Sequence, residues 1–403
     1  MTRQPLLRVQ ELRIDFAGRG RDGTVPAVRG VSLDLAAGEC LALVGESGSG
    51  KSATARSLIG LTGPTATVRA AALEFDGVDL RRLTDRQWRR LRGRRIALVL
   101  QDALVALDPL RTVGAEVAEP LRAHGLLPRA RVGDRVRELL HGVGIPEPAA
   151  RARQYPHELS GGLRQRALIA GAVAAGPDLL IADEPTTALD VAVQRQILDL
   201  LGERRDAGTA VLLISHDLAV VARLADRIAV MRHGLIVEQG PAEAVLRSPQ
   251  HPYTRELLDA RSATTRASSP APGRPVLEVR GVSRTYPVPG GGTRTAVDDV
   301  SFTVAAGETL GLVGESGCGK TSTALLALGL LAADGGTVLL DGEAWSGVPE
   351  RRRRPHRHRI GVVWQDPTSR CPRSTWPPRR GSSICSPGCS RGCVSECCSS
   401  PTT

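Results

Sequence analysis

Aromatic residues are scarce in this chain, at 2% of its 403 residues. A hydrophobic core built almost without them must consist of Leu, Val, Ile and Ala, and the hydrophobic content of 41% is sufficient for packed domains. Long hydrophobic runs are also missing, because no stretch of 18 or more apolar residues occurs and the first residues, MTRQPLLRVQ, lack the apolar segment of a signal peptide. We therefore expect a cytosolic protein whose contact with any membrane is peripheral.

Lysine is the second scarcity. The chain carries 53 Lys and Arg residues, but only Lys51 and Lys320 are lysines. Arg presents a wide planar fork, whereas Lys is a compact charge on a flexible stem and suits a narrow pocket that surrounds a phosphate. The net charge of +11 is otherwise typical of a genome that favours Arg codons, and we do not interpret it as a nucleic-acid surface.

Each lysine is the seventh residue of the same eight-residue motif, GESGSGKS at 45–52 and GESGCGKT at 314–321. Each copy follows an apolar stretch and precedes a helical pattern, the context in which G-x-x-x-x-G-K-[ST] forms a phosphate-binding loop (P-loop). The glycines of such a loop let backbone N–H groups surround the phosphates, the Lys reaches the β- and γ-phosphates, and the Ser or Thr contacts Mg²⁺. The predicted ATP-binding residues are Gly45, Gly48, Gly50, Lys51 and Ser52 in the first copy, and Gly314, Gly319, Lys320 and Thr321 in the second.

The two motifs belong to an internal repeat. Its matching segments are 7–16 with 277–286, 27–52 with 296–321, and 96–102 with 360–366. Between the copies, residues 260–275 are rich in Ser, Ala, Pro and Thr and show no periodic apolar pattern, as in a linker. We expect a complete domain at 5–258, a linker at 259–275, a partial second domain at 276–370 and an aberrant tail at 371–403.

The hydrophobic pattern of the first copy predicts an α/β fold. Residues 7–44 alternate as strands do, and residues 51–61 open a helix at the P-loop. Residues 115–153 and 160–176 have helical spacing, the latter with Ser160 as N-cap. Short apolar runs separated by helical stretches indicate buried parallel strands. They lie at 178–183, 210–215 and 227–231.

A second chemical motif follows one of these runs. In LLIADEP, residues 179–185, four apolar residues bring Asp183 and Glu184 to the end of a strand. Asp183 can hold Mg²⁺ through water, and Glu184 can orient or deprotonate a water that attacks a phosphate. A lone apolar-Asp-Glu string is usually an ordinary strand end, but behind a P-loop in the same domain it predicts a functional pair.

Between these motifs, LSGGLRQR at 159–166 resembles the signature of the ATP-binding cassette (ABC) ATPases. Other marks of that family stand around it in the family's order, namely a glutamine loop, an aspartate loop, a switch histidine and an aromatic residue that stacks on adenine. The matching residues are Gln101, Asp190, His216 and Phe16, with Gln365 and Tyr286 as the second-copy counterparts of Gln101 and Phe16. The resemblance implies a P-loop NTPase fold with a RecA-like parallel sheet core, an antiparallel β subdomain and an α-helical subdomain.

The resemblance also implies a mechanism. Two cassettes pair head to tail, and ATP lies between the P-loop of one and the signature of the other, where Ser160, Gly161 and Gly162 grip the γ-phosphate. Glu184 and His216 would act in hydrolysis. Gln101 would contact Mg²⁺ and relay the nucleotide state to a membrane-spanning permease. We therefore expect an ATPase that uses ATP and Mg²⁺ at the cytoplasmic face of the cell membrane.

The segment SPQHPYTREL, 248–257, follows the first cassette. It resembles the oligopeptide and dipeptide importer branch, which also includes nickel and glutathione systems; the alternative is a chance surface tail. The branch implies peptides or similar solutes as cargo, and permease subunits and an extracytoplasmic solute-binding protein as partners. Two alternatives remain for the chain as a whole: a soluble tandem cassette ATPase that acts on ribosomes or nucleic acid, and a catalytically impaired truncated chain.

Two basic runs, 81–95 and 351–359, occupy equivalent places in the two copies. This equivalence favours a solvated surface element of the fold over a nucleic-acid site. Base-stacking platforms also interleave aromatic residues with basic ones, and the first run offers only Trp88. We therefore expect no nucleic-acid partner.

The composition changes abruptly in the tail. Six of the eight cysteines lie at 371–403, but their spacing is not that of a zinc site, and Pro and Gly oppose a helix. We expect this tail to be disordered and hypothesise that it is translated out of frame. The second copy then lacks a signature, an Asp-Glu pair and a switch histidine, so hydrolysis would require a homodimer through the first cassettes or a second ATPase subunit.

Overall fold

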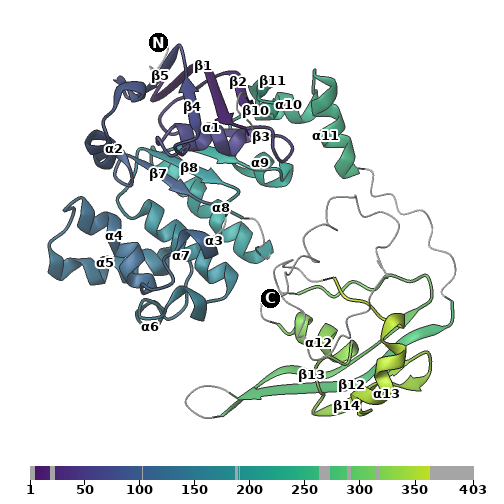
Figure 1. Cartoon of the computed structure of the whole chain (residues 1–403). Coiled ribbons are helices and arrows are strands. Elements are labelled where there is room, and N and C mark those ends of the chain that lie inside the picture. Colours follow the sequence, from purple (N-terminus) through teal and green to yellow (C-terminus); the bar gives the residue numbers. More distant parts are fainter. Residues whose placement is uncertain are drawn as a thin grey trace, which may run out of the picture. The chain divides into compact units, whose positions relative to one another are not determined.

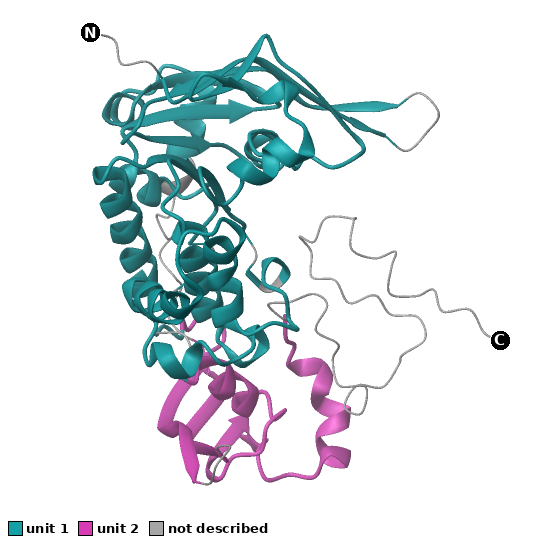
Figure 2. Cartoon of the chain, turned by 90° about the vertical axis from the view of Figure 1, so that its left-hand side faces the viewer, with its two compact units in different colours: residues 1–269, 312–318 teal, residues 270–311, 319–403 magenta. Residues whose placement is uncertain are grey.

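The computed structural model describes residues 5–18, 23–101, 103–186, 189, 191–262, 273–287, 292–314 and 318–363. The chain divides into two compact units, one formed by residues 1–269 with 312–318 and the other by residues 270–311 with 319–403 (Figure 2). Each unit contains an antiparallel sheet and a helix that begins at a P-loop lysine.

The first unit combines two sheets with a set of helices (Figure 1). The six-stranded sheet consists of β3 (Cys40–Val44), β7 (Ile96–Val99), β8 (Leu179–Asp183), β9 (Ala210–Ile214), β10 (Arg227–Arg232) and β11 (Leu235–Pro241). The antiparallel sheet consists of β1 (Leu7–Ala17), β2 (Thr24–Leu35), β4 (Ala66–Arg69), β5 (Ala72–Phe75) and β6 (Val78–Asp79). The helices are α1 (Lys51–Ser57), η1 (Leu80–Arg82), α2 (Asp85–Leu91), α3 (Ala103–Ala106), α4 (Val113–Ala123), α5 (Arg129–Gly142), α6 (Pro148–Arg151), η2 (Pro156–Glu158), α7 (Gly161–Val173), α8 (Val191–Asp206), α9 (Leu218–Leu224), α10 (Ala242–Arg247) and α11 (Pro252–Ser262).

The six-stranded sheet places the chemical motifs at one edge. Its strand order is β11-β10-β3-β9-β8-β7, in which β11 is antiparallel to β10 and the other pairings are parallel. Every residue of β3, β8 and β9 is buried, as expected for parallel strands covered on both faces. Parallel strands end at the same edge of a sheet, so β3, β8 and β9 bring the segments that follow them to one place.

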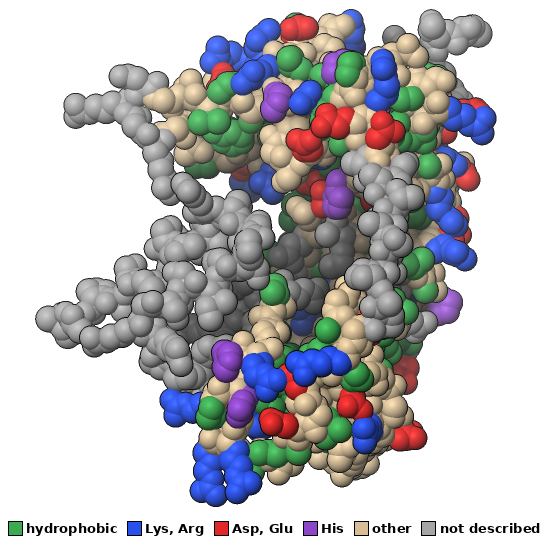
Figure 3. Space-filling view, turned by 90° about the vertical axis from the view of Figure 1, so that its right-hand side faces the viewer, with side chains coloured by type: hydrophobic (Ala, Val, Ile, Leu, Met, Phe, Trp, Pro, Cys, Tyr) green, Lys and Arg blue, Asp and Glu red, His purple; other side chains and the backbone are tan. Residues whose placement is uncertain are grey.

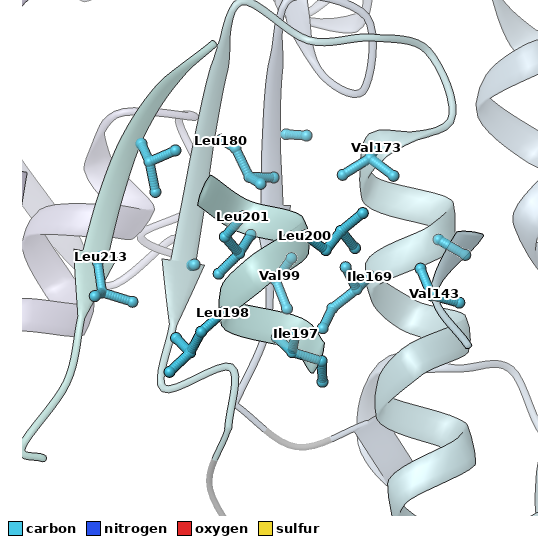
Figure 4. Packing of buried hydrophobic residues seen from close by; sticks show 14 of the residues in the cluster. Val99, Val143, Ile169, Val173, Leu180, Ile197, Leu198, Leu200, Leu201 and Leu213 are labelled. Atoms are coloured by element: carbon cyan, nitrogen blue, oxygen red, sulfur yellow. The ribbon is translucent and has the colours of Figure 1, made fainter. Parts of the chain in front are cut away.

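Helices cover this sheet and complete a large core. In α8, Ile197, Leu198 and Leu201 are buried, and they lie with side chains of β8, β9 and α7 in one hydrophobic cluster (Figure 4). The sheet strands contribute Leu180 and Leu213 to the same cluster. Since an α-helix presents one stripe to its partner, this spacing fixes which face of α8 lies on the sheet.

A helical group joins this core. Helices α4, α5 and α7 pack against one another, and α4 buries Val113, Val117 and Leu121, which recur every four residues. The Thr112 side chain accepts a hydrogen bond from the Ala115 N–H, which satisfies one of the unpaired donors at the start of α4. The expected α-helical subdomain is therefore present, divided into separate helices by turns.

The second unit is smaller. Its four-stranded sheet has the order β13-β12-β14-β15, built from β13 (Thr293–Ala305), β12 (Pro275–Pro287), β14 (Gly335–Leu340) and β15 (Glu343–Ala344). Its helices are α12 (Lys320–Ala327), α13 (Glu350–Arg353) and η3 (Arg354–Arg359). Val282, Leu326 and Trp345 belong to a hydrophobic cluster between the sheet and α12. The unit thus contains the antiparallel portion of a cassette and a P-loop helix.

Two local expectations need correction. Helix α1 ends at Ser57 rather than at residue 61, because Gly60 adopts a left-handed φ of 63° and lies against the Trp88 ring. The basic run at 351–359 is not wholly solvated, since Arg357 is only 5% exposed. On the described part of the face shown in Figure 3, acidic and basic side chains are interspersed.

Candidate nucleotide-binding site

The first P-loop is shaped by glycines that lie close to backbone. Gly45 has a φ of 149°, and a Cβ at this position would lie 2.1 Å from the Met231 carbonyl oxygen. Gly50, the N-cap of α1, has a φ of 103°, and a Cβ there would lie 2.4 Å from the Ala27 carbonyl oxygen. Gly48 has a φ of 80° with open space around it. The sequence therefore needs glycine here for both conformation and close approach.

Lys51 lies inside this loop. The side chain is buried, and its ammonium donates to the carbonyl oxygens of Gly45 and Glu46 at 2.8 and 2.7 Å and to the Ser49 hydroxyl at 3.3 Å. Burial lowers the pKa of Lys51, while the carboxylates of Glu184 and Asp183 act in the opposite direction. The loop thus holds the Lys51 ammonium in place, and a positive charge at this position suits a polyphosphate.

Ser52 and Asp183 form the candidate Mg²⁺ site. The Ser52 hydroxyl donates to Asp183 Oδ1 at 3.1 Å, although the two residues are 131 positions apart. Asp183 ends β8 and is 2% exposed, and this burial raises the pKa of its carboxyl. Paired oxygen ligands fit Mg²⁺, which in phosphate sites usually takes only one or two carboxylates and draws other ligands from phosphate and water. Among the described residues there is no cluster of three or more His, Cys, Asp or Glu side chains suited to a metal.

Glu184 lies at the centre of a polar trio. Its Oε2 accepts a hydrogen bond from Gln101 Nε2 at 2.8 Å, and its Oε1 lies 3.0 Å from His216 Nδ1. Glu184 has a φ of 47°, a conformation that costs free energy for a residue other than glycine and recurs at functional sites. Three separate motifs, from the ends of β7, β8 and β9, therefore converge on one carboxylate.

The signature residues begin α7. The Ser160 hydroxyl accepts a hydrogen bond from the Leu163 N–H at 3.4 Å, which confirms the predicted N-cap. Ser160 and Gly161 are exposed and Gly162 is half-buried. The N-terminus of this helix is therefore accessible to an anion carried by another molecule.

The predicted adenine-stacking residues lie on the antiparallel sheets. Phe16 is half-buried on β1, where it pairs with Val25 and Ala66 of the flanking strands. In the second unit the Tyr286 hydroxyl lies 3.5 Å from the hydroxyl of Ser322, two positions after the P-loop lysine. Tyr286 therefore lies beside the helix that its own P-loop begins.

The second P-loop keeps the turn of the first. Gly319 has a φ of 96°, and a Cβ there would lie 2.1 Å from the Ala296 carbonyl oxygen. Gly314 has a φ of 153°. Lys320 begins α12 and is half-buried, whereas Lys51 is buried, and Thr321 is exposed. Two other predicted site residues, Asp190 and Gln365, lie outside the described residues.

The contact of Tyr253 with the first P-loop is one that the sequence motifs did not predict. The Tyr253 hydroxyl accepts a hydrogen bond from the backbone N–H of Glu46, the second residue of the first P-loop, at 3.0 Å. The two residues are 207 positions apart, so no local pattern could join them. The signal available in the sequence is the HPYT segment itself, which by pattern indicates only an importer branch.

Comparison with known proteins agrees with the geometry. A family model described as "ABC transporter" matches residues 28–187 and 297–377. The chain is 44% identical over 372 residues to the "Peptidoglycan transport ATP-binding protein YejF" of Agrobacterium fabrum, covering 90% of this chain and 68% of that protein. It is 48% identical over 257 residues to the "Dipeptide transport ATP-binding protein DppD" of Bacillus subtilis, covering 63% of this chain and 76% of that protein.

A solved structure resembles a part of this chain. It is a dimeric ATP-binding cassette in a post-hydrolysis state with ADP and Pi, with a TM-score of 0.53 and 28% identity, covering 59% of this chain and 98% of that chain. In the part of the chain that the structure describes, no helix is both long and apolar enough to span a bilayer.

Proposed function

Because the chain belongs to the ABC transporter family and is an ATPase of that family, we propose that it drives a membrane permease that imports peptides or similar small solutes. The observation that carries the hydrolytic part of this proposal is the convergence of Gln101 and His216 on Glu184, at the same sheet edge as the P-loop. The relatives named for dipeptide and peptidoglycan transport support the class of solute. On this proposal its partners are permease subunits at the cytoplasmic face of the membrane and a solute-binding protein on the other side.

We propose the following roles at the first site. Lys51 and the P-loop N–H groups bind the β- and γ-phosphates of ATP, and Phe16 stacks on the adenine. Ser52, Asp183 and Gln101 would hold Mg²⁺, which supplies charge neutralisation to the phosphates when bound.

Hydrolysis then depends on Glu184. Its carboxylate orients a water and accepts its proton as the water oxygen forms a bond to the γ-phosphorus. The bond from that phosphorus to the β,γ-bridging oxygen breaks, and ADP and phosphate are the products. His216, held at 3.0 Å from Glu184, fixes the orientation of the carboxylate.

A complete site also needs the signature of a facing cassette. The exposed start of α7 can supply Ser160, Gly161 and Gly162 to another molecule. Within residues 276–403 of the chain no second LSGG sequence occurs. We therefore propose that two chains pair through their first cassettes, each P-loop facing the other's signature, or that a second ATPase subunit takes the place of one chain.

The two matches to the family model also support a domain division of the chain. We propose a complete cassette at 5–258, a linker at 259–275, a partial cassette at 276–370 and a separate tail at 371–403. The second match extends to residue 377, beyond the proposed boundary.

Phosphate release by the purified full chain tests the proposal. Glu184→Gln keeps the shape of the side chain but removes the base, and we expect turnover to fall by about 100-fold or more. Glu243→Gln is the matched control, because Glu243 is exposed on α10 and forms an ion pair with Arg247 one turn away.

Two results would contradict the proposal. Equal activity of Glu184→Gln and wild type would remove Glu184 from the reaction. Specific activity that stays constant as the chain is diluted would contradict pairing between chains, because a dimer must dissociate at low concentration.

A further inference from the structure

The HPYT segment (His251, Pro252, Tyr253 and Thr254) begins α11, beyond the last strand of the cassette. Tyr253 is among the largest fully buried side chains of the chain, at 1% exposure. The chain contains only three tyrosines, and this one lies under the first P-loop. A tail that merely covered the surface would not need a buried phenol at this position.

Tyr253 is one peptide group away from the P-loop lysine. Its hydroxyl accepts the Glu46 N–H at 3.0 Å, and the Gly45 carbonyl oxygen, which belongs to the same peptide group as that N–H, accepts the Lys51 ammonium at 2.8 Å. A hydrogen bond that fixes the Glu46 N–H therefore also restrains an oxygen that positions the Lys51 charge. If the hydroxyl is lost, a partly buried donor is left without its partner.

The ring of Tyr253 is itself held in place. The Arg232 guanidinium stacks over it, 4.5 Å from the ring centroid, and Arg232 follows Met231, whose carbonyl lies against Gly45. The Tyr253 N–H donates to His251 Nδ1 at 3.1 Å. The N–H of His251 donates in turn to a carboxylate oxygen of Glu238 on β11 at 3.0 Å. The segment is thus tied to the cassette on both sides of the ring.

Helix α11 also reaches the switch segment. A cavity of about 380 Å³ is lined by Gly45 and Glu46 of the P-loop, His216 and Leu218 of the switch segment, and Leu257 of α11. Leu257 lies one turn after Tyr253, so the same helix touches the backbone of the P-loop and borders the cavity beside His216.

We propose that the HPYT segment is a positioning device for the first nucleotide site, in which the Tyr253 hydroxyl fixes the Gly45–Glu46 peptide group and thereby the Lys51 ammonium that binds ATP. The inference rests on the proposed function, because it assigns ATP to this loop. Tyr253 acts on Lys51 through a backbone peptide group, so it is a positioning residue.

Equilibrium titration with a fluorescent ATP analogue, mant-ATP, tests this role in the full chain. All variants carry Lys320→Ala, so that the signal reports the first P-loop. Tyr253→Phe removes only the hydroxyl, and we expect the Kd to rise about threefold to tenfold, the usual effect of one lost hydrogen bond. Tyr155→Phe is the matched control, because Tyr155 is 41% exposed and distant in sequence from the loop; its Kd should not change.

Steady-state hydrolysis separates positioning from damage to the fold. A positioning role raises the KM for ATP while kcat changes by less than about twofold, whereas partial unfolding lowers kcat and leaves KM unchanged. An unchanged Kd and KM in a folded Tyr253→Phe chain would overturn the inference. If that variant does not fold, Arg232→Gln, which loosens the ring but keeps the hydroxyl, must raise the Kd, and an unchanged Kd there would also overturn it.

The two proposals fail differently. If the wild-type chain binds mant-ATP but releases no phosphate, the proposed hydrolysis is contradicted. The positioning role is then decided by comparing the Kd of the Tyr253→Phe chain with that of the wild type. If the wild-type chain and the Tyr253→Phe chain both hydrolyse ATP with the same KM, only the positioning role is contradicted.

Discussion

Nearly the same apolar sequence precedes the two P-loops of this chain, but it forms a strand only before the first. Residues 40–44, CLALV, form β3, which is buried at every position between β9 and β10. Residues 309–313, TLGLV, are all described and form no strand, and Val313 is 92% exposed. A parallel strand depends on neighbours that hydrogen-bond to it on both sides. Residues 276–363 contain no apolar runs equivalent to β8, β9 and β10. Residues 309–313 therefore have no neighbouring strands with which to form a parallel sheet.

The segments after the two lysines differ much less. Gly50 and Gly319 share the left-handed turn, and each precedes a helix that begins at the lysine. The turn and the helix depend on contacts close in sequence or within the antiparallel sheet, which both units possess. The comparison therefore separates what a P-loop motif specifies by itself, a turn and a helix, from what the rest of a cassette must supply, a strand and a catalytic carboxylate.

The largest expected difference between the two loops is in turnover. Lys51→Ala should lower ATP hydrolysis by about 100-fold, because it removes the buried charge that stabilises the phosphates beside Glu184. Lys320→Ala should change hydrolysis by less than about twofold, because the second loop has no Asp-Glu pair of its own in this chain. Phosphate release at saturating ATP measures both. Equal losses would show that the second loop belongs to a working site and would break the comparison.

Much of the first site could be predicted from sequence. Gln101, Glu184 and His216 come from three distant motifs, and the structure brings them within hydrogen-bonding distance. This was possible because each motif ends a strand of one parallel sheet, so that topology alone places the ends together. The burial of the strands followed in the same way from their continuous apolar runs.

Other features could not be predicted, for a physical reason. The contact between Tyr253 and Glu46 joins segments 207 positions apart, and its partner atom is a backbone N–H, which leaves no mark in the sequence. The burial of Arg357 could not be predicted, because a run of arginines is usually solvated and the backbone carbonyls that Arg357 contacts come from a distant part of the sequence. Whether residues 309–313 form a strand depends on neighbouring strands from elsewhere in the chain, not on the sequence of residues 309–313 itself.

Asp183 allows a prediction of intermediate size. Burial raises the pKa of its carboxyl, so its ionised form disfavours the folded state, and this cost disappears as the pH falls below the raised pKa. Asp183→Asn keeps an acceptor for the Ser52 hydroxyl but removes the charge. We expect the Tm of the nucleotide-free chain to rise by about 1–4 °C at neutral pH, with a smaller difference as the pH is lowered.

The same variant should lose the response to metal. Added Mg²⁺ with ATP should raise the Tm of the wild type, and much less that of Asp183→Asn, because a neutral amide is a poorer Mg²⁺ ligand. Differential scanning fluorimetry over a pH series measures both effects. A variant that melts below the wild type at neutral pH, or that keeps the full Mg²⁺ response, would contradict the assignment.

The smallest expected effect concerns an arginine that both units share. Arg92 donates to the carbonyl oxygens of Ile59 and Gly60 at 2.7 and 2.9 Å, beyond the end of α1. Arg357 donates to those of Leu328 and Gly329 at 2.6 and 3.2 Å, beyond the end of α12. Each guanidinium also stacks on a tryptophan, 5.1 and 5.2 Å from the ring centroid. Each unit therefore uses an arginine that stacks on a tryptophan to satisfy the free carbonyls after the P-loop helix, and in the second unit Arg353 also donates to the Gly329 carbonyl oxygen at 2.8 Å.

Arg92→Gln and Arg357→Gln should each lower the free energy of unfolding by about 1–2 kcal/mol, through lost hydrogen bonds and lost stacking. The loss should be larger for Arg357, whose side chain is 6% exposed, than for Arg92, whose side chain is 27% exposed. Denaturant unfolding followed by tryptophan fluorescence measures it, with exposed Arg90→Gln and Arg354→Gln as matched controls. If Arg357→Gln behaves like its control while Arg92→Gln does not, the second P-loop helix lacks a stabilised end, and the likeness between the two units stops at the turn.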